Sequence, residues 1–92
     1  MSSSTKKLPS GHSDQADTLI HSSAELGALV RDQRKRLALK QIDIAGLSGT
    51  GNRFIVDLEN GKPTVQLQKA LDVIALLGLE IVVRPKRAGS LG

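Results

Sequence analysis

The sequence predicts a small all-α domain of four to five short helices, with one β-strand at its C-terminal end. Apolar residues recur at spacings of three and four along the middle of the chain, as on one face of a helix, and glycine or proline interrupts the pattern repeatedly. The strand is indicated by the β-branched run Leu79–Arg84, which is closed by Pro85. At 92 residues the chain has room for one domain of this kind and not for two.

Composition divides the chain into three parts. Residues 1–17 are dominated by Ser, Lys, Gly, His and Asp and are predicted to form a disordered arm, and residues 85–92 form a short basic tail. The domain is therefore expected between residues 18 and 84. A folded unit of this size buries only about 60% of its unfolded surface. Because the chain has no cysteine for a disulfide, we expect a second copy to supply the missing stability.

The charge balance favours a polyanionic partner. The chain has 13 Lys and Arg residues against 9 Asp and Glu residues, a formal charge of +4. The absence of cysteine fits a reducing, cytoplasmic compartment. The longest apolar run, Val73–Leu79, is far shorter than the ~20 residues that cross a bilayer, and the first residues lack the apolar stretch of a secretory signal. We therefore expect no membrane partner.

Enzyme chemistry is not expected. The two histidines, His12 and His21, have no metal-ligand spacing with each other or with carboxylates, and no cysteine is available as a ligand. Gly49 and Gly51 lack the remaining residues of a phosphate-binding loop. The sequence therefore predicts no catalytic residues, no cofactor and no metal.

The first helix is predicted from about Ala24 to Leu37. Ser22 and Glu25 form a Ser-x-x-Glu capping box just before the apolar run, which is typical of a helix N-terminus. The core-facing stripe of this helix is formed by Leu26, Leu29, Val30, Gln33 and Leu37. The opposite, charged face is formed by Arg31, Asp32, Lys35 and Arg36.

Two helices of about eight residues follow, at Gln41–Leu47 and Asn52–Glu59. The turn Ser48–Gly51 between them carries two glycines, and Asn60–Gly61 supplies a left-handed cap after the second helix. Such a pair, braced by flanking helices, is a helix-turn-helix, whose second helix enters the major groove of DNA, although short helical pairs also occur in inert bundles. The residues expected to face the core are Ile44, Ala45, Ile55 and Leu58.

A fourth helix is predicted at Val65–Leu77, ended by Gly78. Every position from Val73 to Leu77 is apolar, so one side of this helix meets the core and the other side needs a partner. The strand that follows would have unpaired backbone groups along both edges. It is expected to pair with Thr18–His21 of its own chain or with a second copy of the protein.

Three stretches of the helix pair resemble the Xre, Cro and phage-repressor family. They are Leu39–Ala45 with its glutamine, the following Gly49, and Ile55–Lys62 with its Glu-Asn-Gly-Lys end. Within that family, four stretches resemble the HipB-type antitoxins, which are the DNA-binding partners of HipA kinase toxins: Leu26–Arg31, Asn52–Ile55, Gly61–Thr64 and Leu77–Leu79. The resemblance covers about residues 24 to 84, two thirds of the chain.

The resemblance implies a homodimer that binds a palindromic operator, because a two-fold axis places the two recognition helices about 34 Å apart. It also implies an antitoxin that represses its own operon and neutralises a HipA-like kinase toxin. The alternative is a stand-alone Xre-family repressor without a toxin. A third interpretation is an interaction adaptor that no longer binds DNA, for which Gly51 and Asp57 are the only support.

The expected DNA-binding residues lie on and around the second helix of the pair. Asn52 and Arg53 open this helix, where asparagine can bond adenine and arginine can bond guanine; the alternative is a solvated helix start that touches only phosphate. By resemblance, Gln41 donates to a phosphate and braces a recognition-helix side chain, and Asn60–Lys62 clasps phosphate through backbone N–H groups, although capping alone explains Gly61. The full set is Lys40, Gln41, Gly51, Asn52, Arg53, Val56, Asp57, Asn60 and Lys62.

Several of these residues have two interpretations. Val56 can meet a thymine methyl group, whereas Asp57 is unfavourable near phosphate unless it accepts from a cytosine amine or orients Arg53 one turn away. Gly51 stands where the family often has Ser or Thr and would offer only a backbone N–H. Phe54, the one aromatic residue, packs at the edge of the two helices or contacts DNA.

Charged residues outside the recognition helix have structural and electrostatic roles. By resemblance, Arg34 and Glu59 form an ion pair inside the domain, which fixes geometry and adds little net stability. Some contact with phosphate is expected from the cluster of Arg31, Lys35, Arg36 and Lys40, and further non-specific attraction from Lys86 and Arg87.

Overall fold

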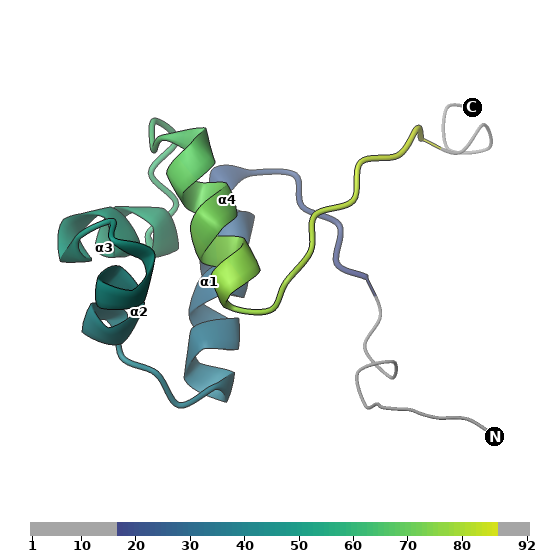
Figure 1. Ribbon diagram of the computed structural model, residues 1–92. Coiled ribbons are helices and arrows are strands. Elements are labelled where there is room, and N and C mark those ends of the chain that lie inside the picture. The colour runs from purple at the N-terminus through teal and green to yellow at the C-terminus, as the bar shows by residue number, and fades with distance from the viewer. Residues whose placement is uncertain (1–16, 87–92) are drawn as a thin grey trace, which may run out of the picture.

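Four helices make up the described part of the chain, residues 17–86 of the computed structural model (Figure 1). They are α1 (Ser23–Arg36), α2 (Gln41–Ser48), α3 (Asn52–Glu59) and α4 (Leu67–Leu76). Each begins and ends within two residues of the helix predicted at that place. The predicted arm, apart from Asp17, and the predicted tail beyond Lys86 lie outside the described residues, as do His12 and Arg87.

Local signals explain where these helices begin and end. Ser22 caps α1, since its hydroxyl accepts a hydrogen bond from the Glu25 N–H. The Glu25 carboxylate accepts from the His21 N–H, one residue earlier than a capping box requires. Gly61 and Gly78 both have a φ of 80°, and this left-handed conformation ends α3 and α4 as the sequence predicts.

The core is built around α3, which contacts both α1 and α2, while α2 also contacts α4. The four core positions predicted for the helix pair are all buried. The side chains of this core come from all four helices and from the residue that follows α4: Val30, Ile44, Ala45, Ile55, Leu58, Ala70, Val73, Ile74 and Leu77. Gln33 belongs to the core-facing stripe predicted for the first helix. Its amide donates to the Leu77 carbonyl at 3.0 Å and thereby connects α1 to the end of α4.

The helices α1 and α3 approach each other most closely at Gly27. A methyl group at this position would lie 2.6 Å from the carbonyl oxygen of Glu59, so the spacing requires glycine. Arg34 lies two turns further along α1 on the same face, because seven residues make about two helical turns. The close crossing therefore brings Arg34 within reach of the Glu59 side chain.

The turn after α1 differs from the prediction. Leu37 is expected in the core-facing stripe but is 46% exposed, because α1 ends at Arg36 and Leu37 already belongs to the turn. Ala38 then adopts a left-handed conformation with a φ of 59°, which glycine usually occupies. The sequence carries no glycine here to signal this turn.

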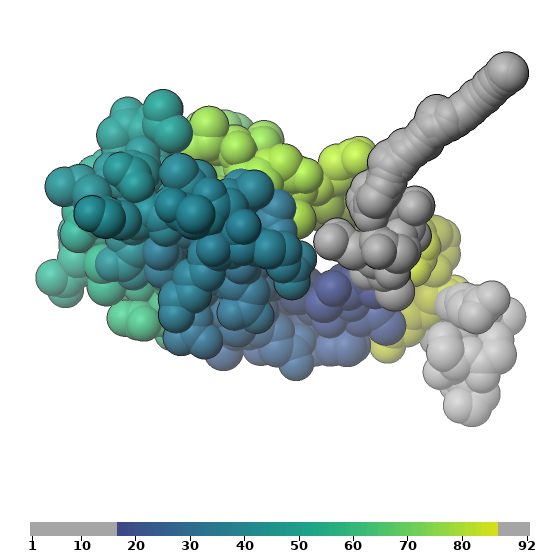
Figure 2. All heavy atoms as spheres, turned by 90° about the horizontal axis from the view of Figure 1, so that it is seen from below, coloured from purple at the N-terminus to yellow at the C-terminus, as the bar shows by residue number. Residues whose placement is uncertain are grey.

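No strand is formed between residues 17 and 86, so the strand predicted at Leu79–Arg84 is absent from the single chain. A strand needs a second edge to pair with, and α4 is followed here by an irregular, mostly exposed segment. This segment meets the N-terminal residues, with Arg84 Nη1 3.6 Å from Asp17 Oδ2. The two segments, purple and yellow, cross in Figure 1, and their atoms lie next to each other in Figure 2.

Candidate nucleic-acid interface

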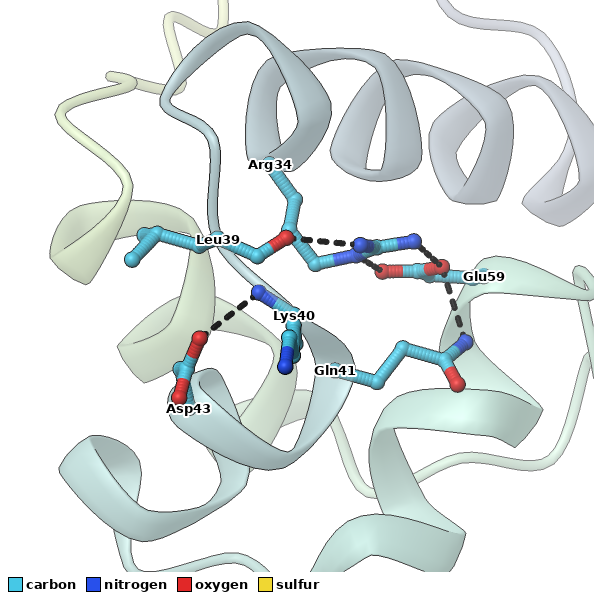
Figure 3. Close-up of polar contacts among 6 residues, drawn as sticks. All are labelled: Arg34, Leu39, Lys40, Gln41, Asp43 and Glu59. Carbon is cyan, nitrogen blue, oxygen red and sulfur yellow. Dashed lines mark hydrogen bonds and ion pairs between the residues drawn. The ribbon is translucent and has the colours of Figure 1, made fainter.

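A buried polar network joins α1, α2 and α3 (Figure 3). Arg34 donates from Nε to Glu59 Oε2 at 2.6 Å and from Nη2 to Glu59 Oε1 at 3.0 Å, and its Nη1 donates to the Leu39 carbonyl at 2.8 Å. The Gln41 amide donates to Glu59 Oε1 at 3.1 Å. The expected ion pair is thus a bidentate pair, the strongest geometry for arginine and carboxylate, and Gln41 is its third member.

The two charges of this network are shielded from water, with Arg34 9% and Glu59 8% exposed. The hydrogen bond with Glu59 raises the pKa of the Arg34 guanidinium above its ordinary value, and burial, which opposes the charged form, offsets only part of this rise. The guanidinium therefore stays charged throughout the neutral pH range. The network fixes the orientation of α3 relative to α1 and α2, because Arg34, Gln41 and Glu59 each come from a different one of these helices.

One of the two N–H donors of the Gln41 amide is used inside the domain, and the expected contact of this amide with a phosphate stays a prediction. In the structure the amide nitrogen is engaged with Glu59, so Gln41 holds the start of α2 against the end of α3. Lys40 precedes it with an exposed side chain, and the Lys40 N–H donates to Asp43 Oδ2 at 2.8 Å. The start of α2 is therefore fixed at two points (Figure 3).

The turn between α2 and α3 depends on two glycines. Gly49 ends α2 with a φ of 71°, and Gly51 precedes α3 with a φ of 86° and a ψ of 151°. The second combination is almost restricted to glycine, so this backbone is incompatible with the Ser or Thr that is frequent at this position. Gly51 consequently leaves α3 without a side-chain cap and exposes the first backbone N–H groups of the helix.

The outer face of α3 carries the predicted base-reading residues. Asn52 and Arg53 are exposed at the start of the helix, and Val56 and Asp57 are partly buried one turn later. Arg53 Nε lies 3.3 Å from Asp57 Oδ1, so the ion pair proposed between these two residues is present in the structure. Asp57 Oδ2 also lies 3.6 Å from Lys62 Nζ, which links the recognition helix to the loop behind it.

The loop Asn60–Lys62 is a helix cap and does not present free backbone donors. The N–H groups of Asn60, Gly61 and Lys62 donate to the carbonyls of Val56, Leu58 and Asp57, each at 3.0 Å. The expectation that these groups clasp phosphate is therefore wrong for this conformation, because the end of α3 uses them. The side chains of Asn60 and Lys62 are exposed, and Lys62 is the cation of this loop.

Phe54 packs inside the domain. It is partly buried against the core, and Lys69 Nζ of α4 lies 5.9 Å from the centre of its ring. This contact is within the range of a cation–π interaction. Of the two interpretations of Phe54, packing at the edge of the helix pair is the one that the structure shows.

Comparison with known proteins identifies the family. No family model matches the chain. It is 53% identical over 62 residues to a protein of Sinorhizobium fredii described as an uncharacterized HTH-type transcriptional regulator, y4mF, a match that covers 67% of the chain and 82% of the relative. The chain belongs to the helix-turn-helix transcriptional regulators of the Xre/Cro type. This regulator is also 32% identical over 59 residues to the ImmF control region 10 kDa protein of Bacillus phage phi105, over 64% of the chain and 66% of the relative.

The fold of this regulator is that of HipB in solved structures. A single-residue variant of HipB, solved in complex with an O2 20mer, superposes with a TM-score of 0.71 at 18% identity, over 78% of this chain and all of that one. A HipB-O4 20mer complex and a HipA-HipB-O2-O3 complex match with TM-scores of 0.70 and 0.71, again at 18% identity and over 77% of this chain and 100% of the other. At this identity the similarity concerns the fold.

The described part of the regulator holds neither a metal-binding cluster nor a membrane-spanning helix. Residues 17–86 contain no group of three or more His, Asp or Glu side chains that could hold a metal ion. None of the helices formed by these residues is long and apolar enough to cross a membrane.

Proposed function

We propose that this regulator is a dimeric, sequence-specific DNA-binding autorepressor and the HipB-type antitoxin of a kinase toxin, acting in the cytoplasm on the nucleoid. The observation that carries the DNA-binding part is the outer face of α3, where Asn52 and Arg53 are exposed on a helix that the Arg34–Glu59 pair holds in place. Side chains at the start of such a helix reach base edges in the major groove. The HipB complexes with O2 and O4 20mers support the proposal, because the chain shares their fold.

Each residue of the interface has a distinct role in this proposal. Asn52 and Arg53 read base edges, and Val56 contacts a thymine methyl group. Gly51 and the exposed N-terminus of α3 offer backbone N–H groups to a phosphate, which the helix dipole favours. Lys40 and Lys62 contact phosphate through their side chains, while Gln41, Asp57 and Asn60 hold the interface in shape.

The dimer is proposed from the apolar surface that one chain leaves uncovered. Leu76 in the last turn of α4 is 41% exposed, and Ile81, Val82 and Val83 are 50%, 67% and 91% exposed. An exposed run of β-branched residues beside an exposed apolar helix end is a surface that a second copy can cover. We propose that Leu79–Arg84 forms a strand only when it pairs with its equivalent across the two-fold axis. The two recognition helices then face a palindromic operator.

The toxin is proposed to bind away from α3, since repression and neutralisation must coexist. A shallow groove on the outer side of α1 is available, lined mainly by the apolar side chains of Leu19, Ile20 and Leu29 with the carboxylates of Glu25 and Asp32. The solved HipA-HipB-O2-O3 complex, whose HipB shares this fold, supports such an arrangement. The second candidate is a stand-alone repressor, which the relatives favour because their descriptions name a transcriptional regulator and a phage control region protein.

Alanine substitutions separate base reading from positioning. We expect Asn52→Ala and Arg53→Ala each to cost roughly 1–3 kcal/mol per half-site and to relax base preference, because they remove hydrogen bonds to base edges. Lys62→Ala should weaken binding to the operator and its sequence variants about equally, without changing base preference, and lower the salt slope by about one per site. Binding to an operator library measures both effects, with Gln68→Ala on the exposed side of α4 as the control. Unchanged base preference in both α3 variants would show that the recognition helix is misassigned.

The toxin is tested by purification from the native operon. We expect the product of the adjacent gene, a HipA-like kinase, to copurify, and a mixture of labelled operator, this protein and that product to form one species larger than the protein–DNA complex. Electrophoretic mobility and sedimentation resolve these species. Competition between the gene product and DNA, or no binding at all, would instead favour the stand-alone repressor.

A further inference from the structure

Asp57 holds an unusual position for an acidic residue on a helix that faces DNA. Its two carboxylate oxygens lie 3.3 Å from Arg53 Nε and 3.6 Å from Lys62 Nζ. The Asp57 side chain is 22% exposed, whereas those of Arg53 and Lys62 are 86% and 52% exposed. A single partly buried carboxylate therefore pairs with both of the cations that the proposed function assigns to base reading and to phosphate contact, and it offsets one of their two positive charges.

The geometry of the Arg53 pair leaves the reading end of that side chain available. Asp57 is contacted by Nε, so the two terminal amino groups of the guanidinium remain to bind O6 and N7 of a guanine. The carboxylate itself is repelled by phosphates, and most groups on the floor of the major groove are acceptors that repel it too. The best partner for a carboxylate there is the N4 amino group of cytosine.

We infer that Asp57 is a specificity-determining residue that acts mainly by exclusion. On unrelated DNA it keeps Arg53 and Lys62 paired and places a negative charge against acceptors, which weakens binding. On the operator it orients Arg53 toward a guanine and accepts a hydrogen bond from a neighbouring cytosine, while Lys62 is released to a phosphate. This inference rests on the proposed DNA-binding function and adds to it the base class that α3 selects.

The test compares the full-length protein with Asp57→Asn, Asp57→Ala and Asp57→Glu on a randomised duplex library and on one unrelated duplex at several salt concentrations. Asp72→Asn is the matched control, because Asp72 is exposed on α4 and accepts a hydrogen bond from Gln68 of the same helix, away from α3. Circular dichroism verifies that each variant is folded. Asp57→Asn keeps the shape of the side chain and removes only its charge, so it remains informative if the alanine variant unfolds.

We expect Asp57→Asn to bind the unrelated duplex about fivefold more tightly per protomer at about 0.15 M salt, with a salt slope steeper by ~0.9, because Lys62 gains one phosphate contact. At one position of each half-site its preference should change from cytosine to adenine, since asparagine bonds adenine N6 and N7. Asp57→Ala should lose preference at that position, and Asp57→Glu should keep the weak binding to unrelated DNA.

The two effects are expected together. A wild-type protein that selects an operator, combined with an Asp57→Asn variant that lacks either effect, would overturn the inference and leave the proposed function standing. A change of the same size in Asp72→Asn would also overturn it, because the effect would then follow from net charge alone. A wild-type protein without sequence preference would overturn the proposed function, and this inference with it.

Discussion

Replacing Glu59 with alanine is expected to destabilise the domain by about 3–5 kcal/mol, because the substitution leaves the Arg34 guanidinium buried without its counter-charge. The guanidinium stays charged when Glu59 is removed, because an arginine side chain does not lose its proton in a protein. The full free-energy cost of a buried, unpaired charge therefore remains. The Gln41 amide would lose its acceptor as well. Urea denaturation at a fixed protein concentration measures the difference.

Two further variants make this result specific. Glu80→Ala, which removes an exposed carboxylate, should change the free energy of unfolding by about 0.5 kcal/mol or less. The double variant Arg34→Met with Glu59→Leu should recover most of the loss, since replacing both charges by apolar groups is often neutral. If the free energy of unfolding of the single Glu59→Ala variant lay within about 1 kcal/mol of the wild-type value, the Arg34–Glu59 pair would not be what holds α1 to α3.

The pH dependence of this contribution follows from the raised pKa of Arg34. A group whose pKa is higher in the folded state stabilises the fold fully below its unfolded pKa and loses that contribution only as the pH rises through the folded value. For an arginine this window lies far above neutrality. The stabilising effect of Arg34 should therefore be constant across the neutral range.

Ending the chain after Gly78 is expected to convert the proposed dimer into monomers or aggregates and to weaken operator binding by about a hundredfold or more. Each half-site would then be bound without a tethered neighbour, and linkage of two binding modules typically contributes a factor of ~10²–10⁴. Sedimentation equilibrium gives the oligomeric state, and titration with labelled operator gives the affinity. A truncated protein that forms a stable dimer with unchanged operator affinity would place the interface elsewhere.

A shorter truncation and a point variant test whether the effect comes from the loss of the basic tail or from the shortened chain. Ending the chain after Arg84 removes only the basic tail and should keep the dimer. Val82→Lys keeps the chain length and places a charge in the proposed intersubunit strand, where Val82 is 67% exposed in the single chain. It should dissociate the dimer without unfolding the helices, because Val82 lies outside the core.

The helices could be predicted from the sequence because their signals are local. Gly51 and Asn60–Gly61 bound α3 in the sequence, and the observed helix runs over the same eight residues. The turn at Ala38 could not be predicted, since alanine disfavours a φ of 59° and no glycine marks the position in the sequence. The strand predicted at Leu79–Arg84 is not formed in the single chain, because a strand needs a second edge to pair with and periodicity within one segment does not supply it.

The interface was predictable in its residue types more than in its contacts. Asn52 and Arg53 lie exposed at the start of α3, where the helix-turn-helix pattern placed them. The hydrogen bond from Gln41 to Glu59 joins residues 18 positions apart on two different helices, and sequence spacing gives no sign of it. The φ and ψ of Gly51 explain in the same way why this chain departs from Ser or Thr there.

Selection of bound sequences from a randomised duplex library by the full-length wild-type protein tests the central claim most directly. We predict a two-fold symmetric motif whose half-sites are one helical turn apart, with a guanine and a neighbouring cytosine within each half. Such a motif requires both a reading α3 and a dimer that repeats it. Selected sequences without symmetry or without any preference over the starting library would contradict the claim that α3 reads operator DNA as part of a dimer.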